Sequence, residues 1–386
     1  MTPLLLAPTD VLRFRTTPSA QWPLPSTVQE HFRRALLEAR EPQATGHAEL
    51  ESLELRGPLP WHPKHGVLYP IPLDASKTAD GIRHHRLMEL PAGDTNPAPG
   101  AFAPPCLPAP SVAPAKEGVL TGWWTAEQPS NYLAGSTRFN ATPIPSRELW
   151  TEEARMGVAR PSAGNRRLFA TRSLRLNKDV RIAIQAGLPS DLSDGEEAGA
   201  WEALLQKGQM LLGGDRRLVQ IERRRTGWPV FEKPAPGPWE GPFHVRWTLL
   251  TPAIFLHGSL PGWCRSTLEK HPFPDGQVCL REAKNRPFLR AHLVAHHLGE
   301  PMPVAGWDPI ANRPKPTQLA VPAGSVYHFL CPDAPTATRL VNLLHDSPRS
   351  DLFAEHGWGH GLCAKPELIP PALRALGEKL FRDAMR

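Results

Sequence analysis

Proline constrains this chain more than any other residue type, because it accounts for 46 of the 386 residues where average usage is about 5%. A proline ring interrupts the interior of a helix and removes a hydrogen-bond donor from a sheet. The sequence therefore predicts short helices and strands joined by extended loops. The length of the chain also predicts two domains, each large enough to bury a core.

The charge of the chain is biased toward arginine. Lys and Arg number 44 against 38 acidic residues, a net charge of +6, and 33 of the 44 are Arg. Arginine binds phosphate through a planar fork and stacks on bases, so this bias permits a nucleic-acid partner. Codon bias in a GC-rich genome would produce the same excess of Arg, Ala, Gly and Pro, and both explanations stay open.

The cysteines and the hydropathy of the sequence indicate the cellular compartment of the protein. The five Cys are widely spaced, with no C-x-x-C pair, which argues against a disulfide framework or a cysteine-based zinc site and fits a reducing compartment. No apolar stretch reaches the roughly 18 residues of a membrane helix. We therefore expect a cytoplasmic protein with no membrane partner.

Strand and helix patterns alternate through the first half of the sequence. Residues 11–15 alternate apolar and basic, as in a half-buried strand. A helix over about residues 26–39 follows, with Gln29 and Arg33 off its apolar stripe, which consists of Val28, Phe32, Ala35 and Leu36. A proline-rich surface loop, about 91–118, and a short helix, about 147–155, come next.

An arginine-dense segment then reads as a hairpin over about residues 155–186, with its turn at 177–179. A helix over about 196–207 and two strands around Gly213-Gly214 complete this half. The order of the long elements is β-α-β followed by a second β-α-β. That order is typical of a ferredoxin-like or RRM-like sheet with a large insertion.

The second half begins after a proline-rich linker at residues 234–238. The patterns predict strands at 243–249, 288–297 and 325–331, and helices at 336–345 and 371–385. We therefore predict an α+β fold with domains at residues 1–232 and 238–386.

Known catalytic motifs are absent from the sequence, which contains no G-x-S-x-G, H-E-x-x-H, phosphate-binding P-loop or strand-G-x-G-x-x-G unit. Histidine pairs four residues apart could share a zinc ion on a helix. However, His292 and His296 lie in a strand-like stretch, and His356 and His360 lie among glycines. We predict no metal site, no cofactor and no catalytic residue.

Glycines adjacent to cations are a more informative pattern. Glycine lets the main chain approach a phosphate and present its N–H groups, while Arg neutralises the charge. Gly213-Gly214 precedes Arg216 and Arg217, and Trp307 precedes Lys315. A bulge between strands would equally explain the two glycines, and a core position would explain the tryptophan.

Several of these segments together resemble one known family. It is the RAMP-superfamily subunit, the third Cmr subunit, that binds the 5′ handle of the guide RNA in type III-B CRISPR effector complexes. The stretches that carry the resemblance are residues 25–29, 212–217, 250–255, 261–263, 305–308, 313–316, 321–327 and the glycine-rich 357–361. Asp215 departs from the family, which often has Glu at this position.

The resemblance implies two ferredoxin-like (RRM-like) domains and a non-catalytic RNA-binding role in antiviral defence. It implies three kinds of partner: the 5′ handle of the crRNA, the large polymerase/cyclase-like subunit and the backbone RAMP subunits. We expect the RNA path to be formed by Gln29, Arg33, Arg155, Arg166, Arg167, Arg172, Gly213, Gly214, Arg216, Arg217, Trp307 and Lys315.

Two alternatives remain at this stage. An active RAMP endoribonuclease that processes CRISPR RNA could use a histidine such as His31 as its general acid or base. A His-dependent metalloenzyme is the second alternative. The hairpin arginines could also be no more than a solvated face.

Overall fold

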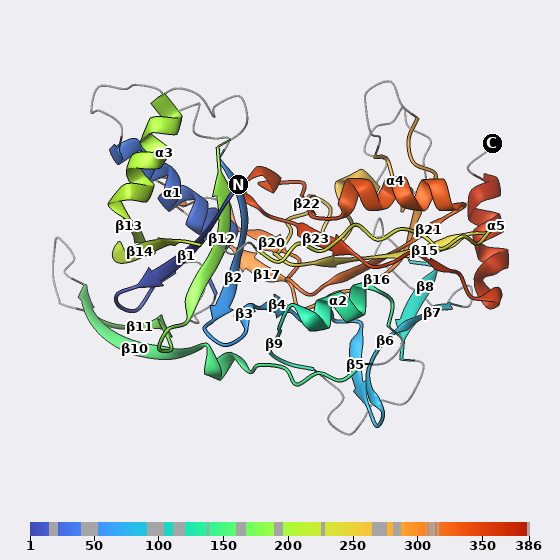
Figure 1. Cartoon of the computed structure of the whole chain (residues 1–386), viewed down its shortest axis with the longest axis horizontal. Helices are drawn as coiled ribbons and strands as arrows, with labels where there is room; N and C mark the ends of the chain where they lie inside the picture. The colour runs from blue at the N-terminus through green and yellow to red at the C-terminus, as the bar shows by residue number, and fades with distance from the viewer. Residues whose placement is uncertain are drawn as a thin grey trace.

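The computed structural model describes residues 1–14, 22–39, 53–90, 104–110, 120–136, 139–159, 167–188, 196–224, 228–264, 276–280, 287–305, 307–308, 313–314 and 316–383. Two antiparallel six-stranded sheets lie side by side along the long axis of the molecule (Figure 1). Helices cover the upper face of each sheet in this view. None of the helices among these residues is both long and apolar enough to cross a lipid bilayer.

The N-terminal sheet has the strand order β13-β14-β1-β12-β2-β3. The central strand, β1, pairs antiparallel with β12 on one side and β14 on the other. The strands are β1 (Thr2–Pro8), β2 (Glu54–His62), β3 (Gly66–Val67), β12 (Arg181–Gly187), β13 (Gln209–Leu212) and β14 (Arg217–Arg223).

Helices α1 (Pro25–Ala39) and α3 (Glu196–Lys207) cover one face of this sheet. The predicted stripe of α1 is confirmed at Val28, Phe32 and Leu36, which are fully buried. Trp201 of α3 packs beside Phe32, with ring centroids 6.2 Å apart. Both helices therefore form where the 3.6-residue periodicity predicted them, because each has an apolar face that the sheet can bury.

The C-terminal sheet has the order β16-β21-β15-β23-β22, and β24 also pairs with β15. Helix α4 (Ala334–Leu344) packs on one face, with the Asp333 side chain accepting a hydrogen bond from the N–H of Thr336 at its N-terminus. The strands are β15 (Phe243–Leu249), β16 (His292–His297), β21 (Val326–Cys331), β22 (Ser347–Pro348), β23 (His360–Cys363) and β24 (Glu367–Leu368).

The other face of the C-terminal sheet is covered by the terminal helix and by part of the insertion. Leu87 and Cys106 share a buried cluster with Val294 and Leu330 of the sheet and with Phe381 of α5 (Arg374–Asp383). The insertion between β3 and β10 contains β4 (Tyr69–Pro70), β5 (Ala75–Thr78), β6 (Gly81–His84), β7 (Arg86–Glu89), β8 (Cys106–Ala109), β9 (Trp123–Trp124) and α2 (Glu127–Leu133).

Two long strands, β10 (Trp150–Ala159) and β11 (Arg167–Leu176), form a separate ribbon beside the N-terminal sheet (Figure 1). Smaller ribbons elsewhere are β17 (Met302–Val304) with β20 (Gln318–Ala320), and β18 (Trp307–Asp308) with β19 (Arg313–Pro314).

Four local predictions were wrong. The first strand is Thr2–Pro8, not 11–15, because the leucines of β1 are buried in the centre of the sheet. Residues 147–155 form a 3₁₀ turn and the start of β10, since pairing with β11 satisfies their backbone. The strand before the turn at 177–179 pairs with β10 and not with β12. Within the proline-rich segment, residues 106–109 form β8, and Cys106 is buried.

The glycine-rich segment 357–361 joins the two halves of the molecule. Gly357 has φ +88°, and a Cβ atom there would lie 2.5 Å from the carbonyl oxygen of Leu55 in β2. Trp358 is fully buried beside it. Glycine is therefore required at position 357 both by backbone conformation and by the close approach of β2.

Candidate nucleic-acid interface

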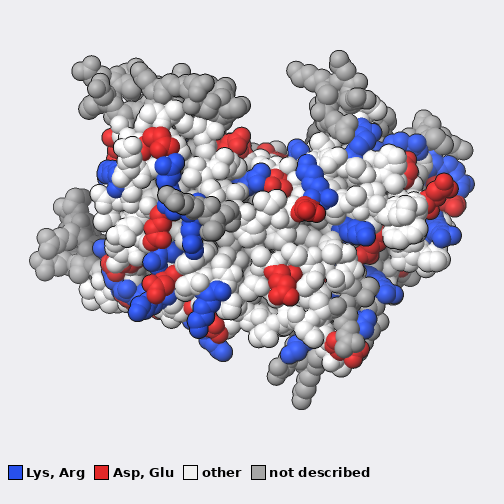
Figure 2. All heavy atoms as spheres, viewed as in Figure 1, with Lys and Arg blue, Asp and Glu red and all other residues white. Residues whose placement is uncertain are grey.

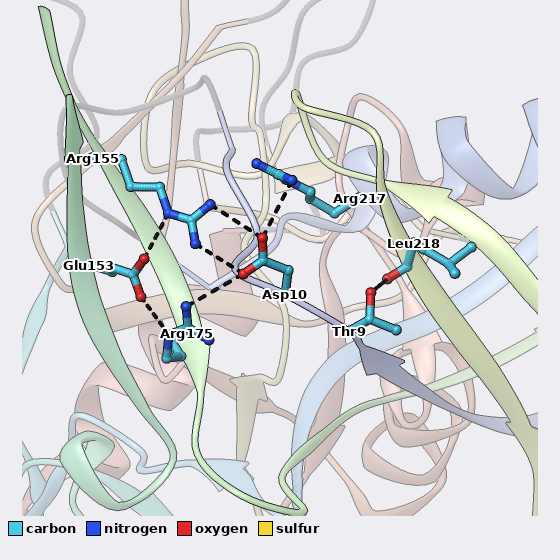
Figure 3. A network of polar contacts seen from close by, with 7 residues as sticks. All are labelled: Thr9, Asp10, Glu153, Arg155, Arg175, Arg217 and Leu218. Carbon is cyan, nitrogen blue, oxygen red and sulfur yellow. Dashed lines mark hydrogen bonds and ion pairs between the residues drawn. The ribbon is translucent and has the colours of Figure 1, made fainter. Parts of the chain in front are cut away.

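Asp10 lies at the centre of a cluster of arginines (Figure 3). Its carboxylate is 3.0 Å from Nη2 of Arg155 in β10, 3.5 Å from Nη2 of Arg175 in β11 and 3.4 Å from Nη1 of Arg217 in β14. Glu153 completes the group by accepting hydrogen bonds from Nε of Arg155 at 2.7 Å and from Nε of Arg175 at 2.5 Å. We call these five residues the Asp10 cluster.

Backbone hydrogen bonds hold the Asp10 cluster together. The N–H and hydroxyl of Thr9 both donate to the carbonyl of Leu218 in β14, at 3.1 and 2.9 Å. Leu12 and Leu174 exchange two backbone hydrogen bonds, at 2.8 and 2.7 Å, which attach the ribbon to the chain after β1. The turn that carries Asp10 is thus fixed to both β14 and β11.

The register of the ribbon places its charged residues on defined faces. Glu153 pairs with Ser173 and Arg155 with Thr171, and side chains alternate between the two faces of a strand. Arg175 consequently shares a face with Arg155. Arg172 lies on the opposite face, where it is 2.9 Å from the carboxylate of Glu152.

Hydrogen bonds within the cluster favour the charged forms of its two carboxylates. The hydrogen bond from Arg155 lowers the pKa of Asp10, and the hydrogen bonds from Arg175 and Arg155 lower the pKa of Glu153. Three arginines against two carboxylates leave a net charge of +1. Exposed ion pairs of this kind stabilise a protein by only about 0–1 kcal/mol, so an incoming phosphate can compete for the same guanidinium groups.

The glycine turn between β13 and β14 lies next to this cluster in the sequence. Gly213 has φ +80°, and a Cβ atom there would lie 2.9 Å from the carbonyl oxygen of Arg13. The N–H of Gly214 donates to that same carbonyl at 2.6 Å. Arg216 has φ +50° and reaches Glu38 at the end of α1, 3.2 Å away. The turn therefore packs directly against the segment after β1.

His31 connects α1 to the glycine turn. Its Nδ1 is 2.7 Å from the carbonyl oxygen of Thr27, and its Nε2 is 3.3 Å from that of Gly213. Both ring nitrogens therefore face main-chain oxygens. A neutral imidazole can donate to only one of these two oxygens, and the contacts on both sides hold the ring between α1 and the glycine turn.

The structure brings together five of the predicted RNA-binding residues, all near the segment after β1: Arg155, Gly213, Gly214, Arg216 and Arg217. Gln29 differs from the expectation, because its side chain is 0% exposed and it lies inside the core rather than off the buried stripe. Arg33 is half-buried on the same helix.

Several predicted residues are not placed by the structure. Arg166 and Lys315 lie outside the described residues, and only the backbone of Arg167 and Trp307 is described. Gly306 is also outside the described residues.

Sequence reasoning missed Asp10, Glu153 and Arg175 as members of one site. The alternation of Glu153 with Arg155 is a strand signal that the expected helix at 147–155 concealed. Asp10 carried no local signal, because its three arginine partners are between 145 and 207 residues away in the chain.

Figure 2 shows that Lys and Arg alternate with Asp and Glu on the left-hand part of this face, where Figure 1 places the ribbon and the N-terminal sheet. Among the described residues, no group of three or more His, Cys, Asp or Glu side chains is arranged to hold a metal ion. The chemistry that these contacts support is binding of an anion by guanidinium groups.

Comparisons with known proteins give the following matches. Residues 11–366 match the family model described as CRISPR-associated protein (Cas_Cmr3). No curated protein matches the chain. Two similar solved chains come from type III-B Cmr-beta complexes with cognate target RNA, one of them also with AMPPnP. They show 12% and 13% identity and TM-scores of 0.42 and 0.41, and each match covers 84% of this chain and 86% of the other. A chain of a Csm3–Csm4 subcomplex from a type III-A CRISPR-Cas interference complex shows 12% identity and a TM-score of 0.39, over 85% of this chain and 92% of that one.

Proposed function

Because the chain belongs to the Cas_Cmr3 family of CRISPR-associated proteins, we propose that it is the non-catalytic subunit that anchors the 5′ handle of the crRNA in a type III-B effector complex. Membership of the family confirms the predicted resemblance to a RAMP-type subunit of these complexes. The binding of the handle, and the residues that perform it, are the proposal.

The strand orders support two ferredoxin-like units within this subunit. In the N-terminal sheet, β14-β1-β12-β2 with α1 and α3 between strands follows the βαββαβ order of that fold. In the C-terminal sheet, β23-β15-β21-β16 follows the same order with α4 before the last strand. We propose that the boundary between these units lies between residues 232 and 238, although the insertion packs against both sheets.

The observation that carries the RNA-binding proposal is the convergence of Arg155, Arg175 and Arg217 on Asp10 beside the glycine turn. A single-stranded RNA backbone binds where cations and main-chain N–H groups lie along one path. Each of these guanidinium groups has five N–H donors, so each can hold its carboxylate and still donate to a phosphate. Asp10 thereby keeps the three arginines oriented before RNA arrives.

The partners that we propose are the large polymerase/cyclase-like subunit and the backbone RAMP subunits, as the resemblance implies. The endoribonuclease alternative needs a histidine such as His31 as its general acid or base. Because both ring nitrogens of His31 face main-chain carbonyl oxygens, this residue is better suited to holding the glycine turn than to proton transfer.

The test is a salt titration of handle binding by the purified full chain. If about five phosphates are neutralised, log affinity for a short single-stranded RNA should fall with log salt at a slope of about −3.5, at about −0.7 per phosphate. A flat response would contradict the proposal. Site-specific, metal-independent cleavage of a CRISPR repeat transcript would instead establish the endoribonuclease.

Recovery from the native host gives an independent test of the assembly. The subunit should purify with sister Cmr subunits and with guide RNAs that share one 5′ end. Purification of the intact chain without RNA and without sister subunits would contradict the proposed place in the complex.

A further inference from the structure

A cavity of about 650 Å³ lies beside α5, formed where the insertion meets the C-terminal sheet. Its walls come from β6 and β7, from the loop after α2, from the linker before β15 and from residues 365–374. In Figure 1 β6, β7 and α5 lie in the right-hand half of the molecule, and the β10–β11 ribbon lies at the left-hand end. The cavity is therefore distinct from the Asp10 cluster. Its volume lies within the 300–1,000 Å³ range of small-molecule sites.

Three cations from different segments line this cavity: Arg86, Lys365 and Arg374. All three are exposed, and none forms an ion pair with an acidic side chain in the described part of the chain. Among the described lining residues, Glu367 is the only acidic one, which gives these residues a net charge of +2. Figure 2 shows several Lys and Arg side chains at this end of the molecule.

The inner wall of the cavity is polar and preorganised. The guanidinium of Arg246, 1% exposed, lies 3.4 Å from Oε1 of Glu367 and 4.6 Å from the ring centroid of Tyr132. It fixes the carboxylate of Glu367 at the edge of the cavity. His84 is 9% exposed, and its Nδ1 is buried without a hydrogen-bond partner in the described structure. Burial lowers the pKa of His84 to about 2, so its ring is neutral and can accept or donate one hydrogen bond.

An aromatic surface completes the cavity. Trp239 lines it with a side chain that is 50% exposed, although an indole of this size is usually buried in a protein core. An exposed indole beside cations is the arrangement on which nucleobases stack. Neither a bare phosphate nor an aliphatic ligand would use this surface.

We propose that this cavity binds one nucleoside monophosphate unit whose base carries an amino group. The phosphate is held by Arg86, Lys365 and Arg374, and the base stacks on Trp239. Glu367 accepts hydrogen bonds from N–H groups on the edge of the base. Guanine offers a ring N–H and an amino group side by side, whereas uracil has no amino group. The unit comes either from a free nucleotide or from an unpaired residue of an RNA strand, since both offer the same chemistry.

The test compares guanosine 5′-monophosphate with uridine 5′-monophosphate on the full chain, using isothermal titration calorimetry. Guanosine monophosphate should bind about tenfold more tightly, the factor expected for loss of one charge-assisted hydrogen-bond pair. The variants Arg374→Ala and Trp239→Ala should each weaken its binding about tenfold. Because both side chains are exposed, the variants should fold as the wild type does.

A matched control is available on the same helix. Arg382 is also exposed, is paired with Glu378 at 3.9 Å and does not line the cavity. Arg382→Ala should therefore leave guanosine monophosphate binding unchanged. Absence of binding at millimolar nucleotide, equal affinity for the two nucleotides, or an equal effect of Arg382→Ala would overturn the proposal.

Competition separates the two sources of the ligand. Displacement of a labelled single-stranded RNA by guanosine monophosphate would identify an RNA residue as the occupant, and simultaneous binding of both would identify a free nucleotide. The variant Arg155→Ala should not change guanosine monophosphate binding, because the Asp10 cluster is separate from the cavity. A failure of handle binding would therefore leave this result intact.

Discussion

Asp10 accepts two hydrogen bonds from the guanidinium of Arg155, at 3.0 Å from Nη2 to Oδ1 and at 3.3 Å from Nη1 to Oδ2. This paired geometry fixes the plane of the guanidinium as well as its position. It also ties the segment after β1 to a ribbon that is not part of either large sheet. The proposed RNA path depends on this contact, because it orients an exposed arginine side chain on the ribbon.

Removing this arginine should affect binding more than stability. Arg155→Ala should weaken single-stranded RNA binding and should reduce the magnitude of the salt slope by about 0.7, the contribution of one phosphate. Its ion pairs are exposed to solvent, so the free energy of unfolding should change little. Fluorescence anisotropy over a series of salt concentrations and urea denaturation measure the two quantities.

Arg382→Ala is the control for nonspecific loss of charge, because this arginine lies on α5, far from the ribbon in Figure 1. It should leave the salt slope unchanged. Equal changes in the two variants would show that net charge alone, and not the Asp10 cluster, determines RNA binding.

The glycine turn should not tolerate a side chain at position 213. Gly213→Ala introduces a Cβ atom 2.9 Å from the carbonyl oxygen of Arg13 at a φ of +80°, so the turn must move. We expect a loss of more than about 1 kcal/mol of stability, the usual cost of placing alanine at positive φ, together with weaker RNA binding. Urea denaturation and anisotropy again provide the measurements.

Gly66→Ala separates the steric effect from the conformational one. Gly66 also has positive φ, +72°, but no atom lies within 4 Å of a Cβ placed there. The free energy of unfolding of this variant should fall only by the cost of placing alanine at positive φ, and the variant should bind RNA as the wild type does. If both variants bind RNA equally well, the packing of the turn against Arg13 is not needed for binding.

The two sheets are joined by an ion pair whose energy can be measured. Arg56 of β2 is 2.6 Å from Oδ2 of Asp346, whose Oδ1 is 2.8 Å from Nε2 of His360. A double-mutant cycle with Arg56→Ala and Asp346→Ala should give a coupling energy of about 0.5–1 kcal/mol, since both side chains are about one-third exposed. The more exposed pair of Arg382 and Glu378, 3.9 Å apart, should give a smaller value. Similar values for the two pairs would contradict a role for Asp346 in joining the sheets.

Buried histidines should make the protein sensitive to mild acid. His244 and His328 lie in adjacent strands with ring nitrogens 3.0 Å apart. Burial first, and then nearby Arg246, lower the pKa of His244 to about 3, and burial also lowers the pKa of His328 well below its usual value. Below about pH 6.5 the unfolded chain binds protons that the folded chain does not. Stability should therefore decrease as the pH falls from about 6.5 toward about 3, and the midpoint of thermal unfolding should be lower at pH 5.5 than at pH 7.5.

The double variant His244→Leu with His328→Leu tests the cause of that sensitivity. This variant removes both histidines of the pair, so neither is left without its partner. The decrease in the midpoint of thermal unfolding between pH 7.5 and pH 5.5 should therefore become smaller. If the midpoint falls as much as in the wild type, the acid sensitivity comes from other buried groups, such as His84 and His85.

Helices α1, α3, α4 and α5 and half of the strands of the two sheets were predictable because each has an apolar face with a clear period. Helix α1 shows this, since Val28, Phe32 and Leu36 are spaced at four residues and are all buried. The ribbon was harder to predict, because β10 pairs with β11 outside both main sheets. Its sequence lacks the buried alternation that marks a strand in a sheet, and Met156 and Leu168 are largely exposed.

The sequence by itself determined the α+β class, the family and the short elements that proline imposes, because these depend on local periodicity and on residues next to one another in the chain. Only the tertiary structure decided which charges meet. Asp10 finds its arginine partners across more than 140 residues, and Gln29 is buried although the apolar stripe predicted for its helix did not include it. Ion pairs and cavities form between distant segments, and their energies depend on the distances that folding creates.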